Sequence, residues 1–189
     1  MSTHKLLAGA LIAVGFFIPD TAHGAVSIIG AGFSRVCYEL AESGRASDEA
    51  FENCDRALSE QALSVRDRAA TLVNRGILYM RKKEHAAAIA DYEAAIRLKT
   101  DLAEAYVNKG IALVHVGGRD GEAVNFLSQG LDLNPVRPEV AYYTRGVANE
   151  ALGRTRAAYD DYRQAAALKP GWAEPQKQLK RFSLVSKPA

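Results

Sequence analysis

The chain of 189 residues has few of the residues that usually carry chemistry. It contains two cysteines and four histidines, and two of these histidines, His4 and His23, lie within the first 24 residues. No phosphate-binding glycine loop and no GxSxG, HExxH or Cys-x-x-Cys motif occurs. The remaining His85 and His115 are too few and too scattered for a metal cluster. These absences predict a protein that is not an enzyme and that uses neither a cofactor nor a metal.

An excess of charge of one sign is also lacking. Lysine and arginine together number 24, against 22 aspartate and glutamate residues, and the basic residues form no run. This balance argues against nucleic acid or an anionic membrane as the main partner. No window alternates apolar and polar residues for long enough to predict a strand, so the chain is expected to be all-α.

Only one long apolar run is present, and it lies at the amino terminus. Leu6–Ile18 follows Lys5, and the small residues Ala22 and Gly24 come after it, which is the pattern of a secretory signal. Thirteen apolar residues are few for a bilayer span, so a retained anchor is the lesser alternative and no stable membrane insertion is expected. The pattern predicts a periplasmic or secreted protein cleaved near Gly24/Ala25, with a signal at 1–24 and a domain at 25–189.

What the chain does have is an internal repeat. A glycine preceded by a large residue and a polar pair returns at intervals of 34 and 36 residues, and a later alanine returns every 35 residues. These positions are Gly76, Gly110 and Gly146, and Ala88, Ala123 and Ala158. Small residues leave room where two antiparallel helices approach closely, and the large apolar residues between them fill the space between layers.

This pattern resembles the tetratricopeptide repeat. The resemblance implies a right-handed helical solenoid of antiparallel helix pairs, about four repeats with a C-terminal capping helix. A degenerate first copy places Cys37 in the glycine position, with Ala50 and Cys54 downstream. The expected repeats are 30–62, 69–102, 103–136 and 139–172, followed by the cap at 173–183.

Two kinds of local signal support the helix pairs. Ser64 with Asp67, and Asp101 with Glu104, predict helix starts, and Pro138 suits a first turn. In addition, an arginine and an aspartate recur 16 residues apart, and an ion pair within the repeat is the favoured interpretation over contact with a ligand. The two pairs are Arg75 with Asp91 and Arg145 with Asp161, while the middle repeat has Lys109 and Phe126.

In tetratricopeptide arrays the first helices of successive pairs line a concave groove that binds the partner. The resemblance therefore implies a protein or peptide partner, whose identity the sequence does not give. The residues expected to face the groove are Arg35, Tyr38, Asn74, Ile77, Arg81, Asn108, Ile111, His115, Tyr143 and Thr144. The side-chain amides of Asn74 and Asn108 can both donate to and accept from an extended main chain, although capping or bridging of helices is the alternative. Tyr143 is the expected hot spot.

The best-known subclass of this family binds chaperone tails through a carboxylate clamp of lysine, asparagine and arginine. The two possible registers of that pattern match this chain only at Asn108 or only at Asn74, so a clamp is not expected. The predicted function is a non-catalytic adaptor or scaffold. The alternative is a structural subunit that self-assembles in an envelope complex.

The two cysteines, Cys37 and Cys54, are expected to form a disulfide. Both would survive signal cleavage, and an exported chain reaches an oxidising compartment. Cys54 lies four residues after Ala50 and three before Ala57, so it shares the helix face that packs against Cys37. Two buried free thiols are the alternative.

Overall fold

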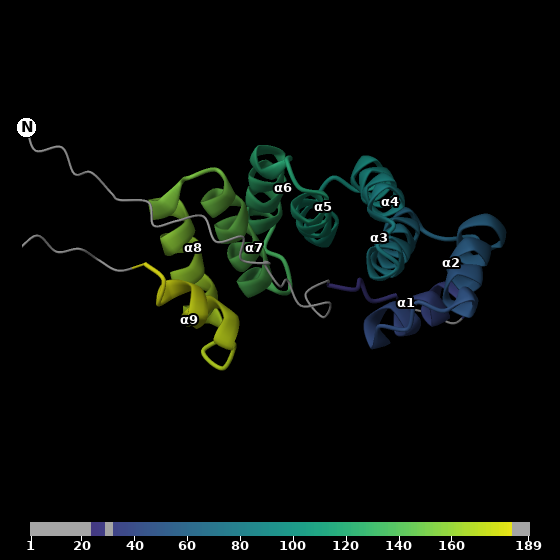
Figure 1. Cartoon of the computed structure of the whole chain (residues 1–189). Coiled ribbons are helices and arrows are strands. Elements are labelled where there is room, and N and C mark those ends of the chain that lie inside the picture. Colours follow the sequence, from purple (N-terminus) through teal and green to yellow (C-terminus); the bar gives the residue numbers. More distant parts are fainter. Residues whose placement is uncertain (1–23, 29–31, 183–189) are drawn as a thin grey trace, which may run out of the picture.

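A computed structural model describes residues 24–28 and 32–182, and this part of the chain contains nine α-helices and no strand. The helices are α1 (Phe33–Ser43), α2 (Asp48–Glu60), α3 (Val65–Arg81), α4 (His85–Leu98), α5 (Ala103–Val116), α6 (Asp120–Asp132), α7 (Pro138–Ala151), α8 (Thr155–Leu168) and α9 (Ala173–Leu179). The first eight form four pairs stacked side by side, and α9 follows the last pair (Figure 1). The predicted all-α solenoid of helix pairs with a terminal cap is confirmed.

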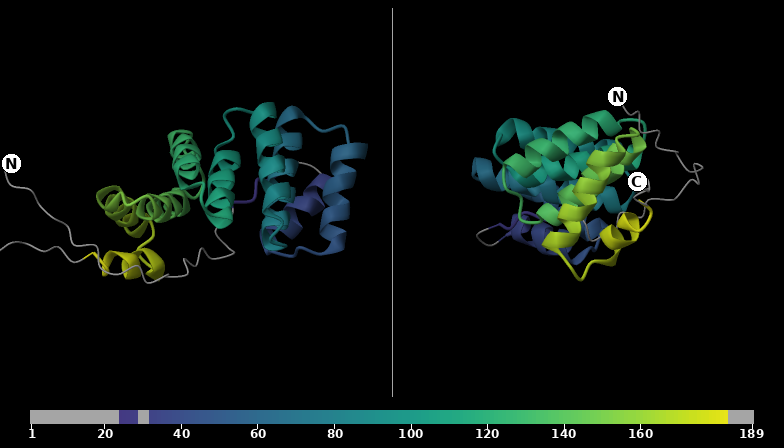
Figure 2. Two further views of the ribbon diagram at one scale, coloured as in Figure 1. Left: turned by 45° about the horizontal axis from the view of Figure 1, so that its top comes forward. Right: turned by 90° about the vertical axis from the view of Figure 1, so that its left-hand side faces the viewer.

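Turning the molecule shows the same stack from two further sides (Figure 2). The short α9 lies against α8 at one end, and α1 and α2 close the other end. Of the expected signal at 1–24, only Gly24 belongs to the described residues, so that prediction lies outside them. None of the described helices is long and apolar enough to cross a bilayer.

The second, third and fourth repeats are each held together where a glycine of the first helix receives a large side chain of the second helix. A Cβ atom added to Gly76 would lie 2.5 Å from the ring of Tyr92, and one added to Gly110 would lie 2.5 Å from Leu127. Both Tyr92 and Leu127 are fully buried. The repeated glycine is therefore a packing requirement, because any side chain there would displace the residue that fills the inter-helix space.

The first repeat replaces this contact by a covalent bond. Cys37 takes the place of the glycine and Cys54 that of the large residue, and the two form the expected disulfide with a Cα–Cα distance of 4.9 Å. Both are fully buried in a small cluster with Leu40, Ala41 and Ala50 that is separate from the main core. The first helix pair is thus held by a cross-link at the position where the other three pairs rely on packing alone.

The helix-start signals are confirmed in two of three places. The amide of Asp67 donates to the Ser64 hydroxyl at 3.1 Å before α3, and α7 begins at Pro138. The helix expected after Asp101 does begin at Ala103, but the cap expected at Asp101 is wrong, because the N-cap residue of α5 is Leu102 and no side chain caps this helix. The Asp101 carboxylate instead accepts a hydrogen bond from Lys99 at 2.6 Å, which lowers the pKa of Asp101.

The predicted ion pairs are present within the second and fourth repeats. Arg75 donates to Asp91 through Nε and Nη2 at 2.8 and 2.7 Å, and Arg145 contacts Asp161 at 2.7 Å. In the middle repeat Lys109 has a different pair of neighbours. Its ammonium group lies 2.8 Å from the carboxylate of Glu93 and 3.8 Å from the centre of the Phe126 ring.

Candidate functional site

The groove is built from the helix position that lies two residues before each repeated glycine. This position holds Asn74 on α3, Asn108 on α5 and Thr144 on α7, and all three side chains are fully buried. A buried amide or hydroxyl needs hydrogen-bond partners, since the loss of water is otherwise uncompensated. The partners of these three residues therefore show what the groove is able to bind.

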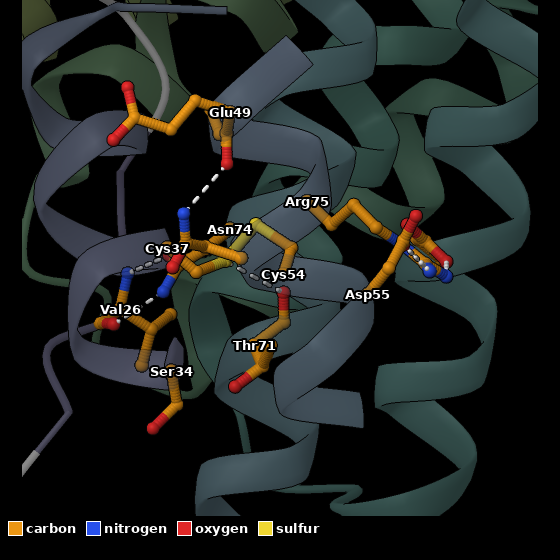
Figure 3. The surroundings of a disulfide bond; sticks show 12 residues. Val26, Ser34, Cys37, Glu49, Cys54, Asp55, Thr71, Asn74 and Arg75 are labelled. Atoms are coloured by element: carbon orange, nitrogen blue, oxygen red, sulfur yellow. Dashed lines mark hydrogen bonds and ion pairs between the residues drawn. A yellow bond between two sulfur atoms is a disulfide. The ribbon is translucent and has the colours of Figure 1, made fainter. Parts of the chain in front are cut away.

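A segment of the chain itself, residues 24–28, supplies partners for Asn74 and Asn108 but not for Thr144. It runs along α3 and α5 on the side away from α4 and α6 (Figure 1). The Val26 amide donates to Asn74 Oδ1 at 2.8 Å, and Asn74 Nδ2 donates to the Val26 carbonyl at 2.9 Å (Figure 3). Asn108 Nδ2 donates to the Gly24 carbonyl at 3.2 Å. We call residues 24–28 the strap.

The strap is extended, and its side chains alternate between the groove and solvent. Val26 and Ile28 are buried, whereas Ser27 between them is exposed. The two buried side chains join the main apolar core, the same cluster that contains the predicted groove residues Ile77 and Ile111. Alternation of this kind is what an extended chain produces when one of its faces packs against a protein.

A cavity of about 400 Å³ continues the groove beyond the amino-terminal end of the strap. Its lining includes Gly24 and Ala25 of the strap, Arg81 of α3, Asn108 of α5 and Val140 of α7. The Arg81 guanidinium packs closely against Gly44. A Cβ atom added to this glycine would lie 2.8 Å from Nη1 of Arg81. The groove therefore has space for a ligand that extends further than the strap.

Three buried polar atoms along this groove have no hydrogen-bond partner among the described residues. They are Asn108 Oδ1, Thr144 Oγ1 and Arg81 Nε. Asn108 thus uses only one of its two amide atoms, in contrast to Asn74, which uses both on the same residue of the strap. Unsatisfied donors and acceptors in a buried position favour the binding of a further polar group.

Tyr143, the expected hot spot, does not face the open groove. It is 1% exposed and lies beneath the capping segment, with ring centroids 4.8 Å from Trp172 and 5.6 Å from Tyr162. Burial raises the pKa of Tyr143, and a hydrogen bond with Gln178 opposes that shift. Tyr143 therefore supports the fold of the last repeat, which the helical spacing could not distinguish from a groove position.

Of the other predicted groove residues, Arg35 and His115 lie near the ends of their helices, whereas Tyr38 lies in the middle of α1. Arg35 is exposed and forms an ion pair with Glu39 at 2.7 Å on its own helix. Tyr38 is half-buried and packs against the main core. His115, at the carboxyl end of α5, stacks on His85 with 5.8 Å between ring centroids. The ion pair of Arg35 stays within α1 and does not involve the strap.

Across residues 24–28 and 32–182, no three histidine, cysteine, aspartate or glutamate side chains are grouped so that they could hold a metal ion. The groove offers amides, a hydroxyl, a guanidinium group and apolar walls. Such a set is suited to a main chain with apolar side chains, and contains no nucleophile paired with a base.

Comparison with known proteins agrees with this architecture. Residues 69–102 and 140–171 match the tetratricopeptide repeat family. The matched segments cover the second and fourth helix pairs, α3–α4 and α7–α8.

Solved structures show the same fold. A crystal structure of MamA is 23% identical with a TM-score of 0.64, and the match covers 80% of this chain and 82% of that one. The first tetratricopeptide domain of human RPAP3 is 23% identical with a TM-score of 0.56, over 60% and 87% of the two chains. The first such domain of Spaghetti (RPAP3), bound to the HSP90 peptide SRMEEVD, is 22% identical with a TM-score of 0.58, over 61% and 90%.

Proposed function

We propose that the protein is an exported, non-catalytic interaction module that holds an extended segment of a partner protein in the groove along α3, α5 and α7. One observation carries this proposal: both amide atoms of the buried Asn74 bind the main chain of an extended segment. Main-chain contacts of this kind give affinity without requiring one particular side chain. The peptide complexes of RPAP3, which has the same fold, support a peptide as the class of ligand.

Photo-crosslinking in the native envelope tests this function. A benzophenone amino acid replaces Arg81, which lines the groove cavity, or Arg97, which is exposed on α4 and serves as the control position. We expect a discrete crosslinked partner at Arg81 and none at Arg97. The same partner at both positions, or none at Arg81, would show that the groove is not the binding site.

Asn108→Ala should weaken the capture of that partner by about 1–2 kcal/mol, or roughly five- to thirtyfold. The substitution removes both a donor and the unpartnered acceptor Oδ1. Asn125→Ala on α6 is the matched control, because Asn125 is exposed. Binding is measured with the purified partner by isothermal titration calorimetry. Equal affinities of the two variants would contradict a role for the groove amides.

Export of the protein is supported by the disulfide, because such bonds persist in oxidising compartments. Cleavage before Ala25 would remove Gly24, and with it the carbonyl that Asn108 binds, but it would keep Val26 and Ile28, the two strap residues that are buried. Amino-terminal sequencing of the natively produced protein should therefore begin at Ala25 or within a few residues of it. A chain that keeps Met1 in the cytosol would refute export.

A further inference from the structure

The strap contacts the groove in the way that we propose for the partner, so the two compete for one place. We propose that the part of the strap that stays in the exported chain, residues 25–28, is an intramolecular competitor of the partner, and that the groove selects an extended segment with β-branched apolar residues two positions apart. This inference rests on the proposed function. It adds the kind of segment that binds and the way in which access to the groove is regulated.

The register of the strap gives the selection rule. Val26 is bound by Asn74 and Gly24 by Asn108, so each step from one first helix to the next corresponds to two residues of the extended segment. Residues two apart on an extended chain point to the same side, which places Val26 and Ile28 in the groove together. Main-chain bonds fix the direction and register, while the two buried side chains provide the apolar contact.

The strap fills this site only in part. By the same spacing, a segment that continues for two more residues beyond Gly24 would reach the level of Thr144, the equivalent residue on α7. Thr144 Oγ1 and Asn108 Oδ1 lack hydrogen-bond partners in the described structure, and the cavity of about 400 Å³ adjoins this end of the strap. A longer partner segment can therefore satisfy groups that the strap leaves unsatisfied.

Tethering compensates for the small number of strap contacts. Only residues 29–31 separate Ile28 from Gly32, at the start of α1, where Gln61 accepts a hydrogen bond from the amide of Ser34. A short tether gives the strap an effective concentration in the millimolar range. A free peptide with the same contacts should thus bind poorly until the strap is weakened.

The test uses a fluorescent, acetylated peptide with the strap sequence Gly-Ala-Val-Ser-Ile and the natively exported protein. In one variant, Val26→Ser and Ile28→Ser remove the apolar anchors, and in a second variant Val26→Pro removes the amide that donates to Asn74. Fluorescence polarisation should show at least tenfold tighter peptide binding to either variant than to the wild type. Ser27→Ala, at the exposed strap position, is the matched control and should behave like the wild type.

Two further measurements assign the bound peptide to the groove. Adding Asn74→Ala to the double serine variant should weaken peptide binding at least tenfold. A peptide with valine and serine exchanged, Gly-Ala-Ser-Val-Ile, should also bind at least tenfold more weakly, because its valine would point to solvent. Hydrogen exchange of the α3 and α5 amides, unchanged from the wild type, confirms that the serine variant is folded.

The inference would be overturned if the peptide bound equally to the wild type and to both strap variants, or if it bound to none of them. A wild-type dimer that the two serine substitutions dissociate would place the strap in the groove of a second copy, which also overturns competition within one chain. The proposed function is judged separately by crosslinking at Arg81. If the partner crosslinks with equal yield to the wild type and to the strap variants, only the proposed competition is refuted. If it crosslinks to neither the wild type nor the strap variants, the proposed function itself is refuted.

Discussion

Replacing Cys37 and Cys54 by alanine should lower the free energy of opening of the first helix pair by about 3 kcal/mol. The cysteines are separated by 17 positions, and closing a loop of this size removes about that much conformational entropy from the unfolded chain. The pair α1–α2 has a neighbour on one side only, and its small core contains no aromatic residue among its buried members. The cross-link therefore supplies what packing provides in the other repeats.

Hydrogen exchange is the appropriate measurement, because repeat arrays open locally and a single unfolding midpoint would average over the repeats. Amides of α1 and α2 should exchange about a hundredfold faster in the alanine variant, while those of α7 and α8 should not change. Cys37→Gly with Cys54→Tyr recreates the pair found at Gly76 and Tyr92, and it should recover part of the lost protection. Unreduced wild-type protein with two free thiols, or equal protection in the alanine variant, would contradict this account.

The repeat made most of the fold predictable. The spacing of glycine and alanine located the helix pairs, because close packing of two helices restricts those positions strongly. The same alignment placed Cys37 and Cys54 at a packed pair of positions, and the structure shows them bonded. Local signals were weaker: Asp101 and Glu104 have the spacing of a cap, yet their side chains contact Lys99 and the Val136 amide instead.

The groove was predictable only in outline. Asn74 and Asn108 were expected either to contact a ligand or to bridge helices, and both contact the strap. The strap itself could not be predicted from the sequence. Its one signal is the alternation Val26-Ser27-Ile28, which is too short to indicate a docked segment and says nothing about where it docks. Likewise, no periodicity within α7 could show that α9 and Trp172 would cover Tyr143, since this depends on tertiary packing.

The ion pairs between helices differ in burial, and this difference predicts unequal contributions to stability. Arg75 contacts Asp91 on α4 within its own repeat and Asp55 on α2, at 2.6 Å, in the preceding one. The Asp91 side chain is 8% exposed, so removal of Arg75 leaves a buried carboxylate without its charge partner. Hydrogen bonding with Asp91 raises the pKa of Arg75, and the guanidinium therefore stays charged throughout the accessible pH range.

Arg75→Met, which keeps the apolar stem of the side chain, should therefore destabilise the second repeat by about 3 kcal/mol. Lys109→Met in the middle repeat is the matched comparison: its partner Glu93 is 40% exposed, so water can replace the lost ion pair and the cost should be about 1 kcal/mol. Combining Arg75→Met with Asp91→Leu should restore most of the loss, because the uncompensated charge is gone. Urea unfolding monitored by hydrogen exchange measures the stability of all three variants. Equal losses for Arg75→Met and Lys109→Met would show that burial of Asp91 does not set the strength of the pair, and an unrestored double variant would show that Arg75 acts mainly through Asp55.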